Sequence, residues 1–117
     1  MRRGETHDHG LEALLSLNDV VLVLERGYWV KFEARVVEAN EHVPQGIRYS
    51  LTLHDSNQHR LIGYDNAHSA KARKRRHSPR SVTWDHRHVL NEVFVYRFES
   101  PEKLLSDFWN DVYQLLK

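Results

Sequence analysis

Apolar and polar residues alternate along two stretches in the first half of the chain, residues 28–36 and 47–54. A period of two indicates a β-strand with one buried face and one face in water. Residues 59–64 follow the second stretch after a short turn, and residues 93–98 form an aromatic-rich run, so both are predicted strands. Residues 20–24 are all apolar and mostly β-branched, which favours a buried strand. The pattern therefore predicts about five strands.

In the last part of the chain, after residue 100, the apolar residues recur at the spacing of an α-helix. Ser100 can cap the first turn with its hydroxyl, Pro101 suits the first helical position, and Glu102 lies near the positive end of the helix dipole. The predicted helix has one apolar stripe, formed by Leu104, Leu105, Phe108, Trp109, Val112, Leu115 and Leu116. A shorter helix is predicted over residues 11–17.

Short connections between consecutive strands favour an antiparallel meander. One face of such a sheet must be covered, and the amphipathic C-terminal helix is the element that can cover it. We therefore expect an α+β fold, with about five antiparallel strands and a C-terminal amphipathic helix packed on one face. Residues 1–10 are polar and are expected to be a disordered tail, whereas residues 11–117 are expected to form a single domain.

Composition narrows the class of protein. A chain of 117 residues with 40% hydrophobic and 28% charged residues suits one globular domain. The absence of cysteine excludes disulfides and thiolate metal sites. No stretch approaches the roughly 20 apolar residues of a membrane span, and the first ten residues lack the apolar core of a signal peptide. We therefore expect a cytoplasmic protein that needs no cofactor.

Positive charge is concentrated in residues 67–88, which we expect to form a long basic loop. This segment contains seven Lys and Arg and one Asp, a net charge of +6, although the whole chain has a net charge of only +1. Such a cationic surface binds polyanions, and contact with nucleic-acid phosphates is the favoured interpretation. The predicted nucleic-acid-binding residues are Lys71, Arg73, Lys74, Arg75, Arg76, Arg80 and Trp84, of which Trp84 is expected to contact a base. A solvated loop without a ligand and a surface for an acidic partner protein are the alternatives.

The end of this loop holds candidate catalytic residues. His86 and His88 flank Arg87, and two imidazoles can supply the general base and the general acid that metal-free RNA cleavage needs. Arg87 can hold a phosphate through its bidentate fork. Asp65 can orient an imidazole, and Tyr64 can donate a hydrogen bond to a phosphoryl oxygen. On a strand the two histidines point to one face and Arg87 to the other, whereas a turn relaxes this separation.

Other interpretations of these residues remain open. The histidines can be ordinary surface residues, because the chain has nine. Two histidines with an aspartate nearby also match the ligands of zinc or manganese, but spacing places no third strong ligand, so no metal site is predicted. The aromatic rings of Trp29, Tyr49, Tyr96 and Phe98 can form a base-stacking platform on the sheet. We predict instead that these rings belong to the core.

Three motifs follow one another along the chain. They are Tyr64-Asp65-Asn66, then His86-Arg87-His88, then a C-terminal group of Tyr96, Phe98, Asp107 and Phe108. Together they resemble the TumE-type toxins of prokaryotic toxin–antitoxin modules, over residues 28–112. In those toxins the link between the first two motifs is only a few residues, whereas here residues 69–84 form a long basic insertion. The resemblance implies a small single-domain toxin neutralised by a cognate antitoxin, often a winged-helix DNA-binding protein encoded beside it.

Two classes of function follow from the sequence. The first is a toxin that acts on RNA, as a metal-independent endoribonuclease whose basic loop holds the substrate phosphates. The second is a non-catalytic module that binds nucleic acid or another polyanion. Whether Asp65 lies close to His86 in the fold decides whether the candidate catalytic residues form a site.

Overall fold

The structure is a computed structural model, and it describes residues 9–41, 43–66 and 85–117. In chain order, the described elements are α1 (His9–Ser16), β1 (Val21–Val23), the 3-10 turn η1 (Glu25–Gly27), β2 (Trp29–Val36), β3 (Ile47–His54), β4 (Arg60–Asp65), β5 (Asp85–Val89), β6 (Glu92–Tyr96) and α3 (Pro101–Leu116). Residues 1–8, in the predicted tail, lie outside this description, and α1 already begins at His9.

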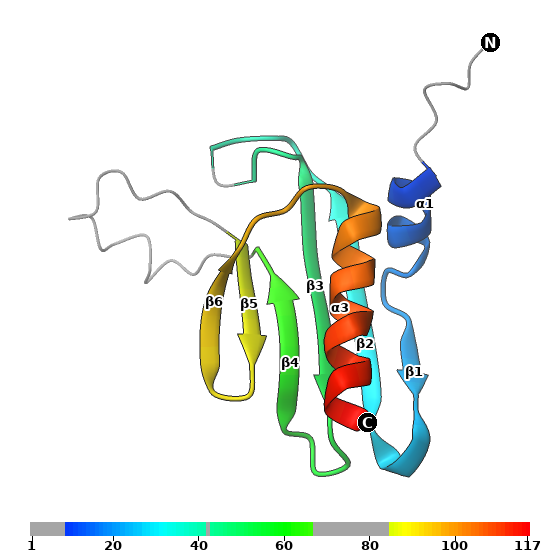
Figure 1. Cartoon of the computed structure of the whole chain (residues 1–117). Coiled ribbons are helices and arrows are strands. Elements are labelled where there is room, and N and C mark those ends of the chain that lie inside the picture. Colours follow the sequence, from blue (N-terminus) through cyan, green and yellow to red (C-terminus); the bar gives the residue numbers. More distant parts are fainter. Residues whose placement is uncertain (1–8, 42, 67–84) are drawn as a thin grey trace.

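The strands form one antiparallel sheet in which each strand pairs with the next along the chain (Figure 1). The predicted α+β class is confirmed, with six strands in place of about five. The additional strand is β5, at residues that the sequence analysis assigned to the end of the basic loop. Its sequence, Asp-His-Arg-His-Val, is polar at every position but the last, so no alternation of apolar residues marks it as a strand.

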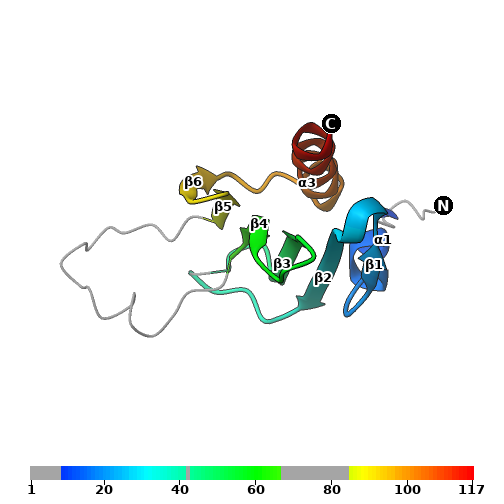
Figure 2. The same ribbon diagram turned by 90° about the horizontal axis from the view of Figure 1, so that it is seen from below.

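The helix α3 lies across one face of the sheet, as predicted (Figures 1 and 2). Ser100 accepts a hydrogen bond from the backbone N–H of Lys103 at 3.1 Å, and Pro101 is the first helical residue. The fully or almost fully buried residues between this covered face and α3 include Val30, Phe32, Ala34, Ile47, Tyr49, Leu51, Leu53, Ile62, Tyr64 and Tyr96 of the sheet and Leu104, Phe108 and Val112 of α3. The alternation in β2 and β3 therefore identified the core face correctly.

Two of the sequence predictions about apolar residues are wrong. The stretch around β1 was expected to be a buried strand, but Val21, Leu22 and Val23 are 50%, 40% and 77% exposed because β1 is the edge of the sheet and pairs with β2 alone. Trp29 was expected in the core, but it is only half-buried and does not belong to the core cluster. Tyr49 and Tyr96 are buried as predicted.

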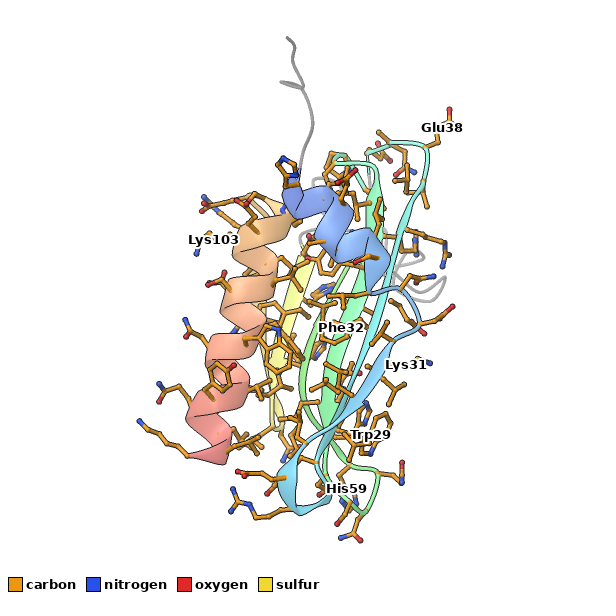
Figure 3. All side chains as sticks on the ribbon, turned by 90° about the vertical axis from the view of Figure 1, so that its right-hand side faces the viewer. Trp29, Lys31, Phe32, Glu38, His59 and Lys103 are labelled. Carbon is orange, nitrogen blue, oxygen red and sulfur yellow. The ribbon has the colours of Figure 1, made fainter. Side chains whose placement is uncertain are left out.

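The opposite face of the sheet, called the open face below, is not covered by either described helix (Figure 2). Figure 3 shows Phe32 between α3 and the sheet, whereas Trp29 and Lys31 point away from α3. The residues at alternate positions of the neighbouring strands share the open face with them. By strand register these are Ser50, Thr52 and His54 of β3, Gly63 and Asp65 of β4, and His86 and His88 of β5.

Candidate functional site

A carboxylate and two imidazoles meet on the open face. Asp65 is the register partner of His86, and Gly63 is the partner of His88, so the three side chains come from adjacent strands. Asp65 Oδ1 lies 3.7 Å from His86 Nδ1, and Asp65 Oδ2 lies 3.3 Å from His88 Nε2. The side chains of Asp65 and His88 are each 19% exposed and that of His86 is 35% exposed. The structure thus brings together three of the five predicted catalytic residues, in a place that solvent still reaches.

The environment of His88 favours its neutral form. Burial lowers the pKa of His88 below its ordinary value of 6.5, and the positive charge of Arg60 lowers it further, against the opposing effect of Asp65. A neutral imidazole that contacts a carboxylate through Nε2 carries its proton on that nitrogen. Nδ1 is then the nitrogen that can accept a proton. Asp65 favours this tautomer, in which Nε2 carries the hydrogen.

Arg60, which the sequence analysis did not select, supplies a cation beside this cluster. Its side chain lies over Gly63, where an added Cβ would be 3.3 Å from Arg60 Cδ and 3.4 Å from Arg60 Nη1. Because Gly63 pairs with His88, the guanidinium lies on the same face as the imidazole, and its charge acts on the pKa of His88. A glycine inside a strand often marks a place where another group approaches the backbone closely, and that signal was present in the sequence.

Arg87 and Tyr64 do not belong to this cluster, because they point to the covered face. Arg87 donates two hydrogen bonds to Asp111 of α3, from Nε to Oδ2 at 2.8 Å and from Nη2 to Oδ1 at 3.0 Å. The Tyr64 hydroxyl donates to the same carboxylate at 2.5 Å. The guanidinium also lies 5.1 Å from the centre of the Phe94 ring. The sequence motifs group both residues with Asp65 and the histidines, and the alternation of β4 and β5 separates them.

The ion pair with Asp111 raises the pKa of Arg87, and burial raises the pKa of Tyr64. Both shifts keep these side chains in the protonated state in which they bind Asp111. Together the three residues anchor α3 to the sheet. Nothing in the sequence pairs Arg87 with Asp111, because the two residues are 24 positions apart and only the packed helix brings them into contact.

Most of the remaining motif residues also serve the covered face. The Tyr96 hydroxyl donates to Asp107 Oδ2 at 2.7 Å, and Phe108 is completely buried. Asn66 is buried as well: its side chain donates to the carbonyl of Ile47 at 2.7 Å and accepts from the backbone N–H of Tyr49 at 3.0 Å. Asn66 thereby continues the pairing of β4 with β3 after the strand ends.

The predicted nucleic-acid-binding residues all lie outside the residues that the structure describes; they are Lys71, Arg73, Lys74, Arg75, Arg76, Arg80 and Trp84. Within the described part of the chain, no group of three or more His, Asp or Glu side chains is arranged to hold a metal ion. Neither of the helices in the described ranges has the length and hydrophobicity needed to cross a membrane.

Comparison with known proteins gives one match. The family model of the toxin TumE matches residues 16–116, which is most of the chain and includes all three motifs. No curated protein and no solved structure matches. A toxin of this kind implies an antitoxin as its partner. The chain belongs to the TumE family of toxins.

Proposed function

We propose that this toxin is a metal-independent endoribonuclease whose catalytic residues are His86 and His88, with Asp65 as a positioning residue. One observation carries the proposal: a single carboxylate contacts two imidazoles on the open face. The division of the motif residues supports it. Tyr64, Arg87 and Tyr96 bind α3, and Asp107 and Phe108 of α3 face the sheet. Asn66 and Phe98 contact β3. The motif residues left on the open face are Asp65 and the two histidines.

The chemistry of the site suits cleavage by the adjacent 2′-hydroxyl of RNA. His88 accepts the 2′-hydroxyl proton, and the 2′-oxygen attacks the phosphorus while the bond to the 5′-oxygen breaks. Protonated His86 donates its proton to that leaving oxygen, so that protons and charge balance and a 2′,3′-cyclic phosphate forms. Asp65 orients His88 and stabilises its imidazolium, as the carboxylate does in a serine protease triad.

Arg60 takes the role in phosphate binding that the sequence analysis gave to Arg87. Its guanidinium is on the same face as His88 and close enough to lower the pKa of that residue. Arginine donates bidentate hydrogen bonds to phosphate oxygens, and such donors stabilise the negative charge that develops in the transition state. Arg60 is exposed, so its guanidinium is accessible to a substrate phosphate.

The basic segment supplies further contacts with the RNA backbone. Five cations between residues 71 and 76 are present with no acidic residue among them. We expect that neutralising Lys71, Arg73, Lys74, Arg75 and Arg76 together weakens RNA binding and reduces the steepness of its salt dependence, because each phosphate contact releases counterions. Binding titrations at several salt concentrations measure both. Unchanged affinity and slope would show that this segment does not hold RNA.

The partner and the compartment complete the proposal. We expect the cognate antitoxin to be a winged-helix DNA-binding protein encoded beside the toxin, and we expect the toxin to act on RNA in the cytoplasm. Co-expression with the adjacent gene, followed by purification of the complex, tests the partner. A neighbouring gene product that neither binds the toxin nor relieves growth inhibition would contradict it.

Cleavage of RNA by the purified protein in EDTA tests the catalytic proposal. The rate should follow a bell-shaped pH profile, because one imidazole must be neutral and the other protonated. The changes His86→Ala and His88→Ala should each lower the rate of RNA cleavage about 10²- to 10⁴-fold. His59→Ala is the matched control, since His59 is an exposed histidine in the turn before β4.

Two other results would change the conclusion. Loss of cleavage in EDTA that zinc or manganese restores would show that the reaction needs a metal. Salt-dependent RNA binding without cleavage at any pH would favour the non-catalytic binding module, with the basic segment as its main functional element.

A further inference from the structure

A second group of side chains on the open face has no role in the chemistry proposed above. Trp29 of β2 and His54 of β3 are register partners, and their rings are stacked, with centroids 4.0 Å apart and an angle of 12° between the planes. Both side chains are half-buried, and neither belongs to the hydrophobic core. Trp29 is directed away from α3 (Figure 3). The covered face therefore does not explain this pair.

The imidazole of this pair has an unmet hydrogen-bonding group. His54 Nε2 lies 3.0 Å from the hydroxyl oxygen of Thr52. His54 Nδ1 is buried and has no hydrogen-bond partner among the described residues, although buried polar atoms almost always have one. Burial lowers the pKa of His54, and the charge of Arg60 lowers it further, so the ring is neutral at neutral pH. The result is a neutral, flat pair of rings with an unsatisfied nitrogen.

Arg60 connects the two groups on the open face. It is the register partner of His54, and its side chain lies over Gly63, the partner of His88. Its charge acts on the pKa of both histidines. His88 is two strands away from β3 and two residues along from His54. The spacing of strands and of residues in a sheet therefore puts the Cα atoms of His54 and His88 roughly 12 Å apart. An extended nucleic-acid strand can contact both groups, with Arg60 between them.

We propose that Trp29 and His54 form a stacking subsite for an unpaired nucleobase of single-stranded RNA whose backbone passes Arg60 and the His86–His88 site. This inference rests on the proposed function, because it names the form of RNA that the same face binds. Aromatic side chains recognise single-stranded nucleic acid by stacking on bases that are free of a duplex. The stack on Trp29 also fixes the imidazole plane, so that the platform exists before RNA binds.

The test compares two polyanions that differ in whether they have bases. The first is a short single-stranded 2′-O-methyl RNA, which lacks the attacking hydroxyl and stays intact, and the second is inorganic polyphosphate. We expect Trp29→Ala to weaken binding of the RNA about 5- to 150-fold, the range found for loss of one stacked base. Binding of polyphosphate should stay within about twofold, because only the charged residues contact it. Trp29→Phe should retain most of the RNA affinity.

Two controls separate stacking from general damage to the protein. Tyr113→Ala removes an exposed aromatic ring from α3, on the other side of the sheet, and should leave both affinities unchanged. Thermal unfolding of Trp29→Ala shows whether the protein is folded at the temperature of the titration. With natural RNA as substrate, Trp29→Ala should raise KM and leave kcat nearly unchanged, which a catalytic residue would not do.

The outcomes distinguish this inference from the proposed function. Equal loss of affinity for RNA and polyphosphate, or unchanged affinity for both, would show that the Trp29–His54 stack is only a cross-strand pair that stabilises the sheet. Cleavage with a KM that does not respond to Trp29→Ala would overturn the subsite and leave the catalytic proposal intact. RNA binding that depends on Trp29 in a protein that never cleaves would do the reverse.

Discussion

On one face of the sheet, α3 covers a row of apolar side chains and binds the sheet through Arg87, Tyr64 and Asp111. On the opposite face, the same strands present Asp65, His86 and His88, in a half-buried cluster that α3 does not cover. Residues of the two groups are neighbours along the strands. Tyr64 precedes Asp65 in β4, and Arg87 lies between His86 and His88 in β5. Neighbouring residues of one motif therefore belong to different environments.

This difference shows how a short motif can contain two kinds of residue. Tyr64 and Arg87 hold the helix in place, whereas Asp65 and the histidines on either side of Arg87 are available to a ligand. Strand alternation alone produces the division. We expect changes on the covered face to lower stability, and changes on the open face to lower activity while the protein remains folded.

Phe108→Ala should have the largest effect, and it should act on stability. Phe108 of α3 is fully buried against the sheet, and the centre of its ring lies 5.7 Å from the centre of the Phe32 ring. Truncation of a buried phenylalanine costs about 3–5 kcal/mol of the free energy of unfolding. Denaturant titration measures the loss, with exposed Tyr113→Ala as the control. A change below 1 kcal/mol in Phe108→Ala would mean that α3 does not cover the core as described.

Arg87→Ala should also lower stability, by about 2–4 kcal/mol, because it leaves the Asp111 carboxylate half-buried without its cation. The matched control is Lys103→Ala, which breaks the more exposed pair with Asp107 and should cost less than about 1 kcal/mol. Below its unfolding transition, Arg87→Ala should cleave RNA at nearly the rate of the unchanged protein. A folded Arg87→Ala variant with no activity would place Arg87 in the reaction after all.

Asp65→Asn should reduce the cleavage rate and leave the thermal midpoint nearly unchanged. The amide cannot stabilise the imidazolium of His88, so the rate should fall, by less than the 10²–10⁴ expected for loss of an acid or base itself. Single-turnover kinetics and thermal unfolding measure the two quantities. If Asp65 only ends the strand, Asn should be tolerated in both measurements.

A change of pH should have the smallest effect. The pKa values of His88 and His54 are lowered in the folded protein, so the unfolded chain binds more protons than the folded one below pH 6.5. Their contribution to stability is full above that pH and is lost as the pH falls, with a slope of at most about 1.4 kcal/mol per pH unit for each histidine. His88→Asn should reduce the slope between pH 6.5 and 5. An unchanged slope would show that His88 does not titrate in this range.

The sequence predicted the parts of the fold that local patterns determine. Alternation identified β2 and β3 and their buried faces, and Ser100-Pro101 marked the start of α3. It did not predict β5, because the partners of its polar side chains are on other elements. Arg87 finds Asp111 on α3, and Asp85 accepts a hydrogen bond from the buried Tyr49 hydroxyl at 2.6 Å.

The candidate site was predictable in its residue types and only partly in its geometry. Two histidines and an aspartate indicated acid–base chemistry, and the pairing of β4 with β5 brings them together despite the long insertion between the motifs. Arg87 points to the covered face because residues 85–89 form the strand β5, and the sequence did not predict this strand. Arg60 became a candidate only through its position over Gly63.

Growth inhibition by the His86→Ala/His88→Ala double variant shows whether the open-face cluster is needed for the toxicity of this protein. The double variant, the unchanged toxin and the covered-face variant Arg87→Ala are each expressed without antitoxin, at equal amounts of folded protein. We predict that the double variant is folded and harmless, whereas Arg87→Ala remains toxic wherever it is folded. A fully toxic double variant would contradict the account, because the open-face cluster would then have no part in the activity of the toxin.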